Sequence, residues 1–190
     1  MREQNTDLNT QRDNKRERRP ARLRIRELAI FAMLGTVMFC SKIIMELLPN
    51  IHLLGMFTMT YTLVLRKKAL IPIYIYVFVN GLYAGFATWW VPYLYVWTIL
   101  WAVTMLLPKR MPRRVKMIVY PIVCCLHGLS FGILYAPTEA LLRGMSFEGM
   151  ITWIVMGFPM DILHGIGNIF AGMLIVPLCE LLEKLMKKTY

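Results

Sequence analysis

The sequence predicts an all-α integral membrane protein, with six transmembrane helices in a compact bundle and both termini in the cytoplasm. Of its 190 residues, 57% are hydrophobic and only 17% are charged, whereas a soluble domain carries about a quarter charged residues. The basic residues gather in clusters that alternate with long apolar tracts. A soluble enzyme or a soluble nucleic-acid-binding domain would instead carry its charges over a folded surface. The composition therefore argues against both classes.

The net charge of +11 is first of all a signal of orientation. The 22 Lys and Arg residues, with the exceptions of Lys42 and Arg143, lie in four segments: 1–26, 66–68, 109–116 and 184–188. Short loops rich in Lys and Arg remain on the cytoplasmic side of a membrane. With six spans, every one of these segments falls on that side, so the alternation of clusters and spans is self-consistent.

Each span is expected to contain about 20 mostly apolar residues, the number that crosses a hydrocarbon core of about 30 Å. The first four are predicted, in chain order, at 27–48, 51–65, 69–87 and 89–107. Pro49 ends the first of them, and the second is the shortest. The fifth is predicted at 115–136, ending before Pro137. The sixth is predicted at 159–182 and begins at Pro159, because the first helical turn does not need the N–H group that proline lacks.

The remaining segments are the N-terminus and one long loop. Residues 1–23 are polar and basic and contain no apolar run, which is typical of a disordered tail, here cytoplasmic. The membrane domain is therefore expected at 24–187. Residues 137–158 mix charged residues and glycines with apolar residues, and we expect an outer loop with an amphipathic stretch. The first apolar tract has full spanning length and no marked cleavage site, so a signal peptide is not expected.

Polar residues at membrane depth are candidates for function because they are costly there. Asp161, His164 and Asn168 lie at i, i+3 and i+7, on one face of the outer half of the sixth span. This face forms either the polar wall of a ligand cavity or a network of interhelical hydrogen bonds that locks the bundle. His127, near mid-membrane in the fifth span, is either a packing residue or a ligand contact. These residues lack the spacing of a metal motif, so no metal site is expected.

The fourth span carries an aromatic stripe formed by Trp90, Tyr93, Trp97 and Trp101. Trp97 and Trp101 lie too deep to be interfacial anchors. Their flat rings either stack a planar ligand or pack against lipid and neighbouring helices.

Two further polar residues lie at the outer end of the first span and just after it: Glu46, which can pair with Lys42, and His52. Polar groups thus converge on the outer half of the membrane, as in a protein that captures a ligand from outside rather than in an open channel. Three carboxylates in this region, Glu46, Glu139 and Asp161, favour a ligand with a neutral or cationic ring.

Small residues lie along the first span and in glycine pairs of other spans, where they allow helices to approach closely. Ala29, Ala32, Gly35 and Thr36 of the first span serve either packing within the bundle or docking of another membrane subunit. The four cysteines show no C-x-x-C spacing and are interpreted as small buried hydrophobic residues.

The sixth span begins with the run Gly-Phe-Pro-Met-Asp-Ile-Leu-His-Gly-Ile-Gly-Asn, residues 157–168. It resembles the G-x-P-x-D-x-x-H-x-x-x-N-type run of the substrate-binding S components of energy-coupling factor (ECF) vitamin transporters. Length, six spans, cytoplasmic termini and the small residues of the first span agree with this family over about residues 24–187. The resemblance implies a subunit that binds a vitamin or vitamin precursor from outside. It also implies a transmembrane coupling subunit, docked on the small residues of the first span, and two ATPase subunits.

We therefore expect the substrate-specific subunit of an ATP-driven importer, multi-pass in a bacterial plasma membrane, without a cofactor or a nucleic-acid partner. No P-loop motif occurs in the chain, so partner subunits would hydrolyse ATP. The residues expected around the ligand are Glu46, His52, Trp90, Tyr93, Trp97, His127, Asp161, His164 and Asn168.

Two rival interpretations remain at this point. The first is a non-transporting scaffold for envelope or cell-shape assembly, in which the polar face only holds helices together. The second is an intramembrane enzyme that uses Asp161, His164 and His127 as acid–base groups. The enzyme ranks last because the sequence shows no nucleophile arrangement and no metal motif.

The predicted orientation can be tested by labelling one residue of the third basic cluster. A cysteine introduced as Arg113→Cys should react with a membrane-impermeant maleimide only when the reagent reaches the cytoplasmic face, because positive loops are retained there. Labelling from the outer face of intact cells would show that the span assignment is wrong.

Overall fold

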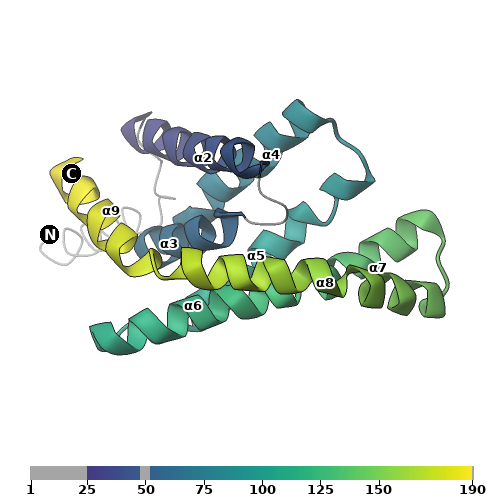
Figure 1. The fold of residues 1–190 in the computed structure, drawn as a ribbon. Helices are drawn as coiled ribbons and strands as arrows, with labels where there is room; N and C mark the ends of the chain where they lie inside the picture. Colours follow the sequence, from purple (N-terminus) through teal and green to yellow (C-terminus); the bar gives the residue numbers. More distant parts are fainter. Residues whose placement is uncertain (1–24, 48–51, 190) are drawn as a thin grey trace, which may run out of the picture. The chain divides into compact units, whose positions relative to one another are not determined.

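The computed structural model describes residues 25–47 and 52–189, which are mostly helical and contain no β-strand (Figure 1). The predicted disordered tail, residues 1–23, lies outside the described residues. Contacts divide the chain into two units, residues 1–30 and 31–190. Of the first unit the structure describes only the beginning of a helix, residues 25–30. The arrangement of helices described below is that of the second unit.

The helical elements follow one another along the chain without any interposed sheet, so the all-α prediction is confirmed for the described residues. They are α2 (Ile25–Met45), α3 (Leu54–Leu65), η1 (Arg66–Ala69), α4 (Leu70–Ala84), η2 (Thr88–Trp90), α5 (Tyr93–Leu106), α6 (Arg113–Leu129), α7 (Phe131–Arg143), α8 (Phe147–Gly172) and α9 (Ile175–Thr189).

The first four predicted spans each coincide with helix, with bounds that differ by a few residues. The helix α2 ends at Met45, and residue 48 of the predicted span lies outside the described part of the chain. The helix α4 ends at Ala84 because Gly85 follows with a φ of 84°, a conformation that glycine adopts without strain. The predicted fourth span consists of the short helix η2 and the helix α5.

The prediction for the last third of the chain is wrong in three places. The fifth span does not run unbroken through 115–136, since α6 ends at Leu129 and α7 continues to Arg143 with Pro137 inside it. The segment 137–158, predicted as a loop, is helical apart from residues 144–146. The sixth span does not begin at Pro159, which lies in the middle of α8.

The features that predicted a loop turn out to cap and stabilise helices. Gly144 ends α7 with a φ of 63°, the left-handed conformation common at helix ends. Ser146 begins α8, and its Oγ accepts a hydrogen bond from the N–H of Gly149 at 3.1 Å. Glu139 and Arg143 pair four residues apart, as helix neighbours do.

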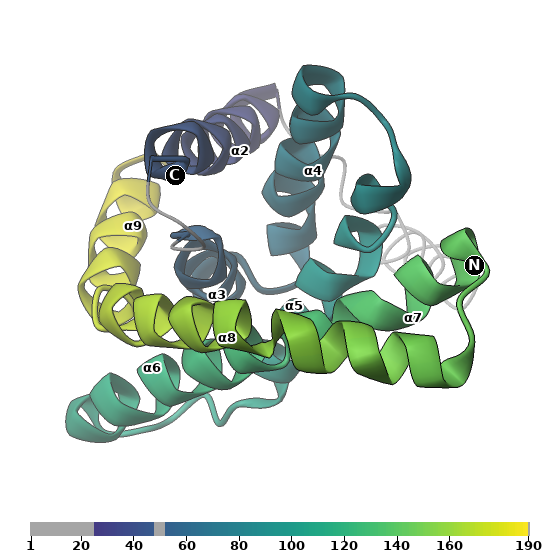
Figure 2. The same cartoon turned by 45° about the vertical axis from the view of Figure 1, so that its right-hand side comes forward.

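The helix α3 lies at the centre of the second unit (Figure 2). Its Thr58, Met59 and Thr62 have no exposed surface. The helix contributes to two apolar clusters, one with Tyr76 and Trp97 of α4 and α5 and another formed with α6, α8 and α9. The hydroxyl of Tyr61 also donates to the carbonyl oxygen of Leu34 in α2, at 3.0 Å. A helix buried on all sides does not need the polar face of a surface helix.

The helices α6 and α8 lie side by side with their backbones in close contact (Figures 1 and 2). A Cβ atom at Gly172 of α8 would lie 2.6 Å from the Cα of Pro121 in α6. At Gly128 of α6, a Cβ would lie 3.1 Å from the backbone nitrogen of Gly165. Glycine at these positions therefore sets the distance between the two helices, as in other membrane bundles.

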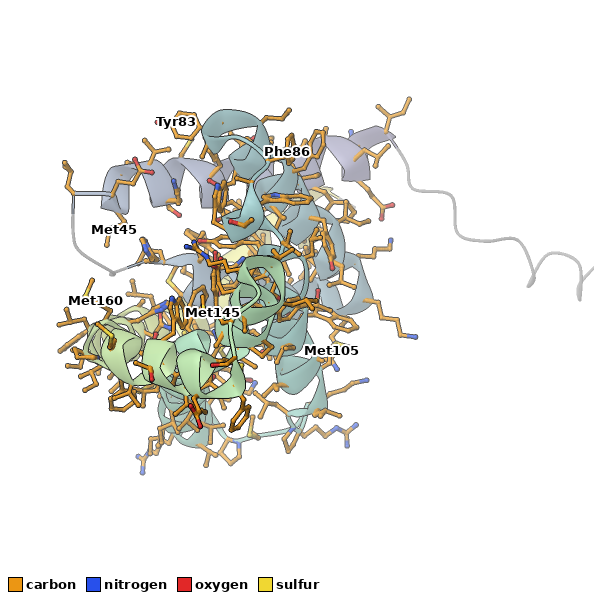
Figure 3. All side chains as sticks on the ribbon, turned by 90° about the vertical axis from the view of Figure 1, so that its right-hand side faces the viewer. Met45, Tyr83, Phe86, Met105, Met145 and Met160 are labelled. Atoms are coloured by element: carbon orange, nitrogen blue, oxygen red, sulfur yellow. The ribbon has the colours of Figure 1, made fainter. Side chains whose placement is uncertain are left out.

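Large apolar side chains remain exposed on the outer faces of the helices. Tyr83, Phe86 and Met160, labelled in Figure 3, are 60%, 52% and 46% exposed. Four helical segments are long and apolar enough to cross a membrane: Ile25–Met45, Thr88–Leu106, Arg113–Arg143 and Phe147–Gly172. The helices α3 and α4, with 12 and 15 residues, are shorter than the usual span. These features favour a membrane-embedded protein.

The close contact of α6 and α8 predicts a clear difference between two glycines of α8. Gly172→Ala should lower the free energy of unfolding by about 1–3 kcal/mol, because the new methyl group meets the backbone of Pro121. The matched control is Gly157→Ala, since a Cβ there meets no atom within 4 Å. The control should be neutral or more stable by up to about 1 kcal/mol.

The midpoint of thermal unfolding in detergent measures both changes. Equal midpoints for the two variants would show that the helices do not approach each other at Gly172.

Candidate ligand-binding site

Trp97 of α5 lies at the centre of a buried group of aromatic rings. Only 2% of Trp97 is exposed. The centroid of its ring lies 5.8 Å from that of Tyr93, one turn earlier in α5, and 5.8 Å from that of His127 in α6. The rings of Tyr76 in α4 and Phe131 in α7 follow at 6.4 Å and 6.0 Å. These five residues are called the Trp97 cluster below.

Two further histidines extend the Trp97 cluster toward α8 and the start of α3. The ring of His164 lies 5.0 Å from that of Phe131, measured between centroids. The ring of His52 lies edge-on to that of His164 at 5.9 Å. Phe131 also touches His127, at 6.3 Å between ring centroids. Phe131 therefore joins residues from widely separated parts of the chain.

Several polar atoms of these residues are buried without a hydrogen-bond partner in the described part of the chain. In and beside the cluster they are Tyr76 Oη, Trp97 Nε1, His127 Nδ1 and His52 Nδ1. The Nε2 of His127 lies 3.2 Å from the carbonyl oxygen of Val96. A carbonyl only accepts, so this Nε2 carries the hydrogen and Nδ1 remains a free acceptor. Buried polar atoms normally have partners, and several unpaired ones in one place need an explanation.

Two asparagines add unpaired acceptors on neighbouring helices. The Oδ1 of Asn80 is buried without a partner, one turn after Tyr76 on the same face of α4. Asn168 of α8 donates from Nδ2 to the carbonyl oxygen of Cys124 at 3.0 Å, while its Oδ1 is unpaired. Asn168 thus holds α8 against α6 and still keeps one acceptor free.

Asp161 has a structural role that the sequence left open. Both of its carboxylate oxygens accept hydrogen bonds from the backbone N–H of Gly132, at 3.2 Å and 3.1 Å. Gly132 lies in the first turn of α7, where N–H groups have no partner within the helix. Ser130, which precedes α7, donates to His127 instead and provides no cap. Asp161 therefore caps α7 from α8, where a carboxylate also complements the helix dipole.

For other predicted residues the structure gives no ring contact with the Trp97 cluster, although Trp90 and Trp101 pack against the same buried core. Glu46 pairs with Lys42, and its side chain is 44% exposed. Trp90 donates from Nε1 to the carbonyl oxygen of Val77 at 2.9 Å and packs against Phe86. Trp101, the last member of the aromatic stripe, donates to the carbonyl oxygen of Arg66 at 3.2 Å.

The structure thus brings together five of the predicted residues: His52, Tyr93, Trp97, His127 and His164. Sequence reasoning missed Tyr76, Asn80 and Phe131. An asparagine in an apolar span is itself a signal of function, and it could have drawn attention to Asn80 and to Tyr76 one turn away. Phe131 gives no such signal.

The carboxylates expected to face a ligand are all engaged by protein groups. Glu46 and Asp161 have the partners given above, and Glu139 pairs with Arg143. Within the described residues, no three His, Cys, Asp or Glu side chains come together as a metal site requires. The groups that remain available are uncharged donors and acceptors between aromatic rings. This set suits a planar, neutral ligand with polar edges.

The small residues of α2 separate into two groups. A Cβ at Gly35 would lie 2.6 Å from Cγ2 of Ile75 and 3.0 Å from the carbonyl oxygen of Pro72, so Gly35 faces α4 of the same chain. Ala32 and Thr36 are exposed. Ala29 precedes Ala32 by three residues on the same helical face.

A scan against protein-family models, a search of curated proteins and a search of solved structures each find no match to this chain.

The capping role of Asp161 predicts a loss of stability that depends on the replacement. Asp161→Ala should lower the free energy of unfolding by about 1–3 kcal/mol, because the N–H of Gly132 is left buried and unpaired. Asp161→Asn keeps an acceptor oxygen and should lose less. Thermal unfolding in detergent measures both variants. An unchanged midpoint for Asp161→Ala would show that Asp161 does not stabilise α7. Asp161 would then again be a candidate ligand contact.

Proposed function

We propose that this protein is the substrate-binding subunit, or S component, of an ATP-driven ECF-type importer that captures a vitamin or vitamin precursor from outside the cell. The observation that supports it best is the set of unpaired polar atoms around Trp97, inside an otherwise apolar bundle. An unpaired polar group in an apolar interior costs roughly 1–3 kcal/mol. A bound ligand with matching polar edges removes that cost. In a protein that binds no ligand, these polar atoms would only lower the stability of the core.

The chemistry of the free groups defines the ligand that fits. The indole N–H of Trp97 donates to a ligand acceptor, while His127 Nδ1 and Asn168 Oδ1 accept from ligand N–H or O–H groups. The rings of Tyr93 and Phe131 provide flat apolar surfaces. Because the nearby carboxylates have protein partners, the ligand in this proposal is neutral, which narrows the neutral-or-cationic expectation from the sequence. To enter, the ligand must separate aromatic rings of the Trp97 cluster that contact one another in this structure.

The depth of the site in the membrane can be estimated from the basic end of the bundle. Three basic residues, Arg66, Lys109 and Arg113, come from two of the basic segments, line one cavity and so lie at one end of the bundle. Trp97 lies nine residues before the end of α5 at that side, about 14 Å away along the helix. If positive loops are cytoplasmic, Trp97 lies near the middle of a hydrocarbon core of about 30 Å.

The finer topology and the partners belong to the same proposal. Six crossings, with both termini in the cytoplasm of a bacterium, would come from α2, α3, α4, α5, the pair α6–α7 and the pair α8–α9. The short helices α3 and α4 then span with help from η1 and their flanking turns. The exposed face of Ala29, Ala32 and Thr36 would dock a transmembrane coupling subunit, and two ATPase subunits would supply the energy.

A scaffold for envelope or cell-shape assembly is the second candidate, and one observation favours it. Asp161 and the Nδ2 of Asn168 make interhelical hydrogen bonds, so part of the predicted ligand face does hold helices together. The scaffold gives no reason for the unpaired atoms around Trp97. The two functions also differ in what co-purifies with the tagged protein, either ATPases or enzymes of envelope assembly.

The proposal predicts that removing the hydroxyl of Tyr76 or the indole N–H of Trp97 weakens ligand binding. In Tyr76→Phe the deleted hydroxyl has no partner in the protein and the ring keeps its shape, so the midpoint of thermal unfolding should be unchanged or higher. In Trp97→Phe the deleted N–H also has no partner, but the smaller ring leaves a cavity in the core, so the midpoint should fall. Each variant should bind the ligand about 10-fold more weakly, the effect of one lost hydrogen bond. The matched control is Trp153→Phe, because Trp153 stacks on Tyr135 outside the Trp97 cluster.

Native mass spectrometry of protein purified from vitamin-rich extract identifies the ligand, and titration of that compound measures the affinities. Preparations that stay empty, together with recovery of envelope-assembly proteins in place of ATPases, would favour the scaffold.

A further inference from the structure

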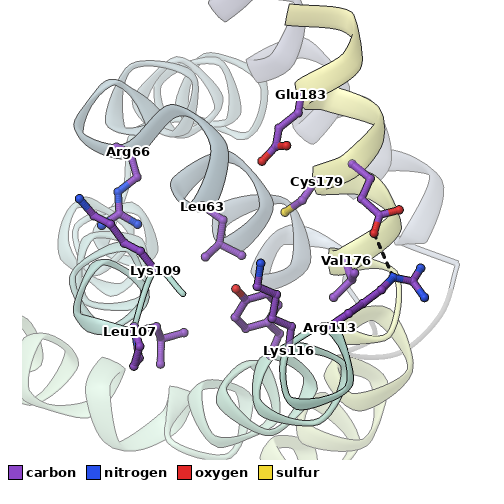
Figure 4. A pocket seen from close by; sticks show the side chains of 12 residues that line it. Leu63, Arg66, Leu107, Lys109, Arg113, Lys116, Val176, Cys179 and Glu183 are labelled. Carbon is purple, nitrogen blue, oxygen red and sulfur yellow. Dashed lines mark hydrogen bonds and ion pairs between the residues drawn. The ribbon is translucent and has the colours of Figure 1, made fainter. Parts of the chain in front are cut away.

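A cavity of about 360 Å³ lies at the basic end of the bundle, away from the Trp97 cluster. It is formed where α3, η1, the segment after α5, the start of α6 and α9 meet (Figure 4). None of the residues predicted to bind the substrate lines it. The apolar side chains of Leu63, Leu107 and Val176 form part of its wall, so the cavity is not simply a gap between charged side chains.

The charged residues around the cavity carry an excess of positive charge. Arg66, Lys109, Arg113 and Lys116 face only two carboxylates, those of Glu180 and Glu183. Arg113 is engaged, since its Nε donates to Glu180 at 3.1 Å. Lys109 and Lys116 have no ion pair with any described residue. The cavity thus offers two free ammonium groups as well as the guanidinium of Arg66.

Arg66 is held in place by bonds on both its backbone and its side chain. Its φ of 56° is unusual for a residue other than glycine, and it forms the turn between α3 and η1. The indole N–H of Trp101 donates to its carbonyl oxygen at 3.2 Å, and its Nη2 donates to the carbonyl oxygen of Met105 at 3.3 Å. A guanidinium has five N–H donors, so most remain available to a ligand. Figure 4 shows Arg66 and Lys109 near each other at one side of the cavity.

The cavity lies at the level where two membrane-crossing segments end. The segment Thr88–Leu106 ends just before Leu107, and Arg113–Arg143 begins at a residue that lines the cavity. Lipid headgroups occupy this level of a bilayer. Basic pockets between helices at the cytoplasmic surface bind the phosphate groups of anionic lipids. The apolar wall suits the glycerol and the first methylenes of the acyl chains.

The geometry points to a binding site for the phosphate group of an anionic membrane lipid in this cavity. Arg66, Lys109 and Lys116 bind the phosphate oxygens, and Leu63, Leu107 and Val176 contact the lipid stem. The site is separate from the Trp97 cluster and does not depend on the transport function. Free phosphate shares the same chemistry, but it has no stem for the apolar wall.

The test uses the full chain in detergent, titrated with dioleoyl phosphatidylglycerol, dioleoyl phosphatidylcholine or inorganic phosphate and observed by native mass spectrometry. Phosphatidylglycerol should bind in preference to phosphatidylcholine. The double variant Lys109→Gln/Lys116→Gln should bind phosphatidylglycerol at least about 10-fold more weakly, because each cation near an anionic lipid contributes substantially. The matched control is Lys67→Gln/Lys184→Gln, which removes two exposed lysines that do not line the cavity. It should change the affinity less than about 2-fold.

A third variant guards against simple misfolding. Glu183→Gln removes a negative charge from the cavity wall and should increase the affinity for phosphatidylglycerol about 2- to 5-fold, a gain that a damaged protein would not show. Equal binding of the two lipids, or an equal loss in the cavity and control variants, would overturn the proposal. Retention of inorganic phosphate that competes with phosphatidylglycerol would assign the site to free phosphate instead of lipid.

Discussion

The close contact between α6 and α8 determines where most of the other polar and aromatic groups lie. The contact is possible because Gly128 and Gly172 leave room for the opposing backbone and Gly165 leaves room for the side chain of Leu129. Membrane helices gain little from apolar association, so this backbone proximity and a few interhelical hydrogen bonds must supply much of the attraction. With α8 held at this distance, Asp161 reaches the first turn of α7 and Asn168 reaches the carbonyl of Cys124. His164 then comes against Phe131, and the aromatic rings close around Trp97.

Much of the helical content could be predicted from composition and apolar runs, whereas the ends of helices in the last third could not. Apolar runs and proline breaks placed the helices before residue 107 within a few residues. After it, Pro137 and Pro159 lie inside helices, because neighbouring groups in a bundle can compensate for the missing N–H. The charges and glycines of 137–149 are helix caps and an i,i+4 pair, and the same residue types occur in loops. Sequence composition alone does not distinguish these cases.

Sequence patterns brought together some residues of the Trp97 cluster and missed others, for one physical reason. Spacing along one helix correctly placed Tyr93 and Trp97 on one face, and polarity singled out the histidines. Spacing cannot show which atoms are already bonded by another helix. Asp161 looked like a ligand group but caps α7, and Trp90 looked like a stacking ring but bonds to Val77. Tyr76 and Phe131 join the Trp97 cluster through contacts between distant segments, which no single-helix pattern contains.

The distinction between bonded and unpaired groups also separates residues with a structural role from those that the proposal assigns to a ligand. A polar residue that only holds helices together has its partners within the protein, as Asp161 does. The Tyr76 hydroxyl, the Trp97 indole N–H and the His127 Nδ1 are buried with no such partner in the described chain. Leaving them so is costly in an apolar surrounding. Replacing each with a group of similar shape and no polar atom would stabilise the empty protein. A ligand that completes their hydrogen bonds would explain why these groups are polar.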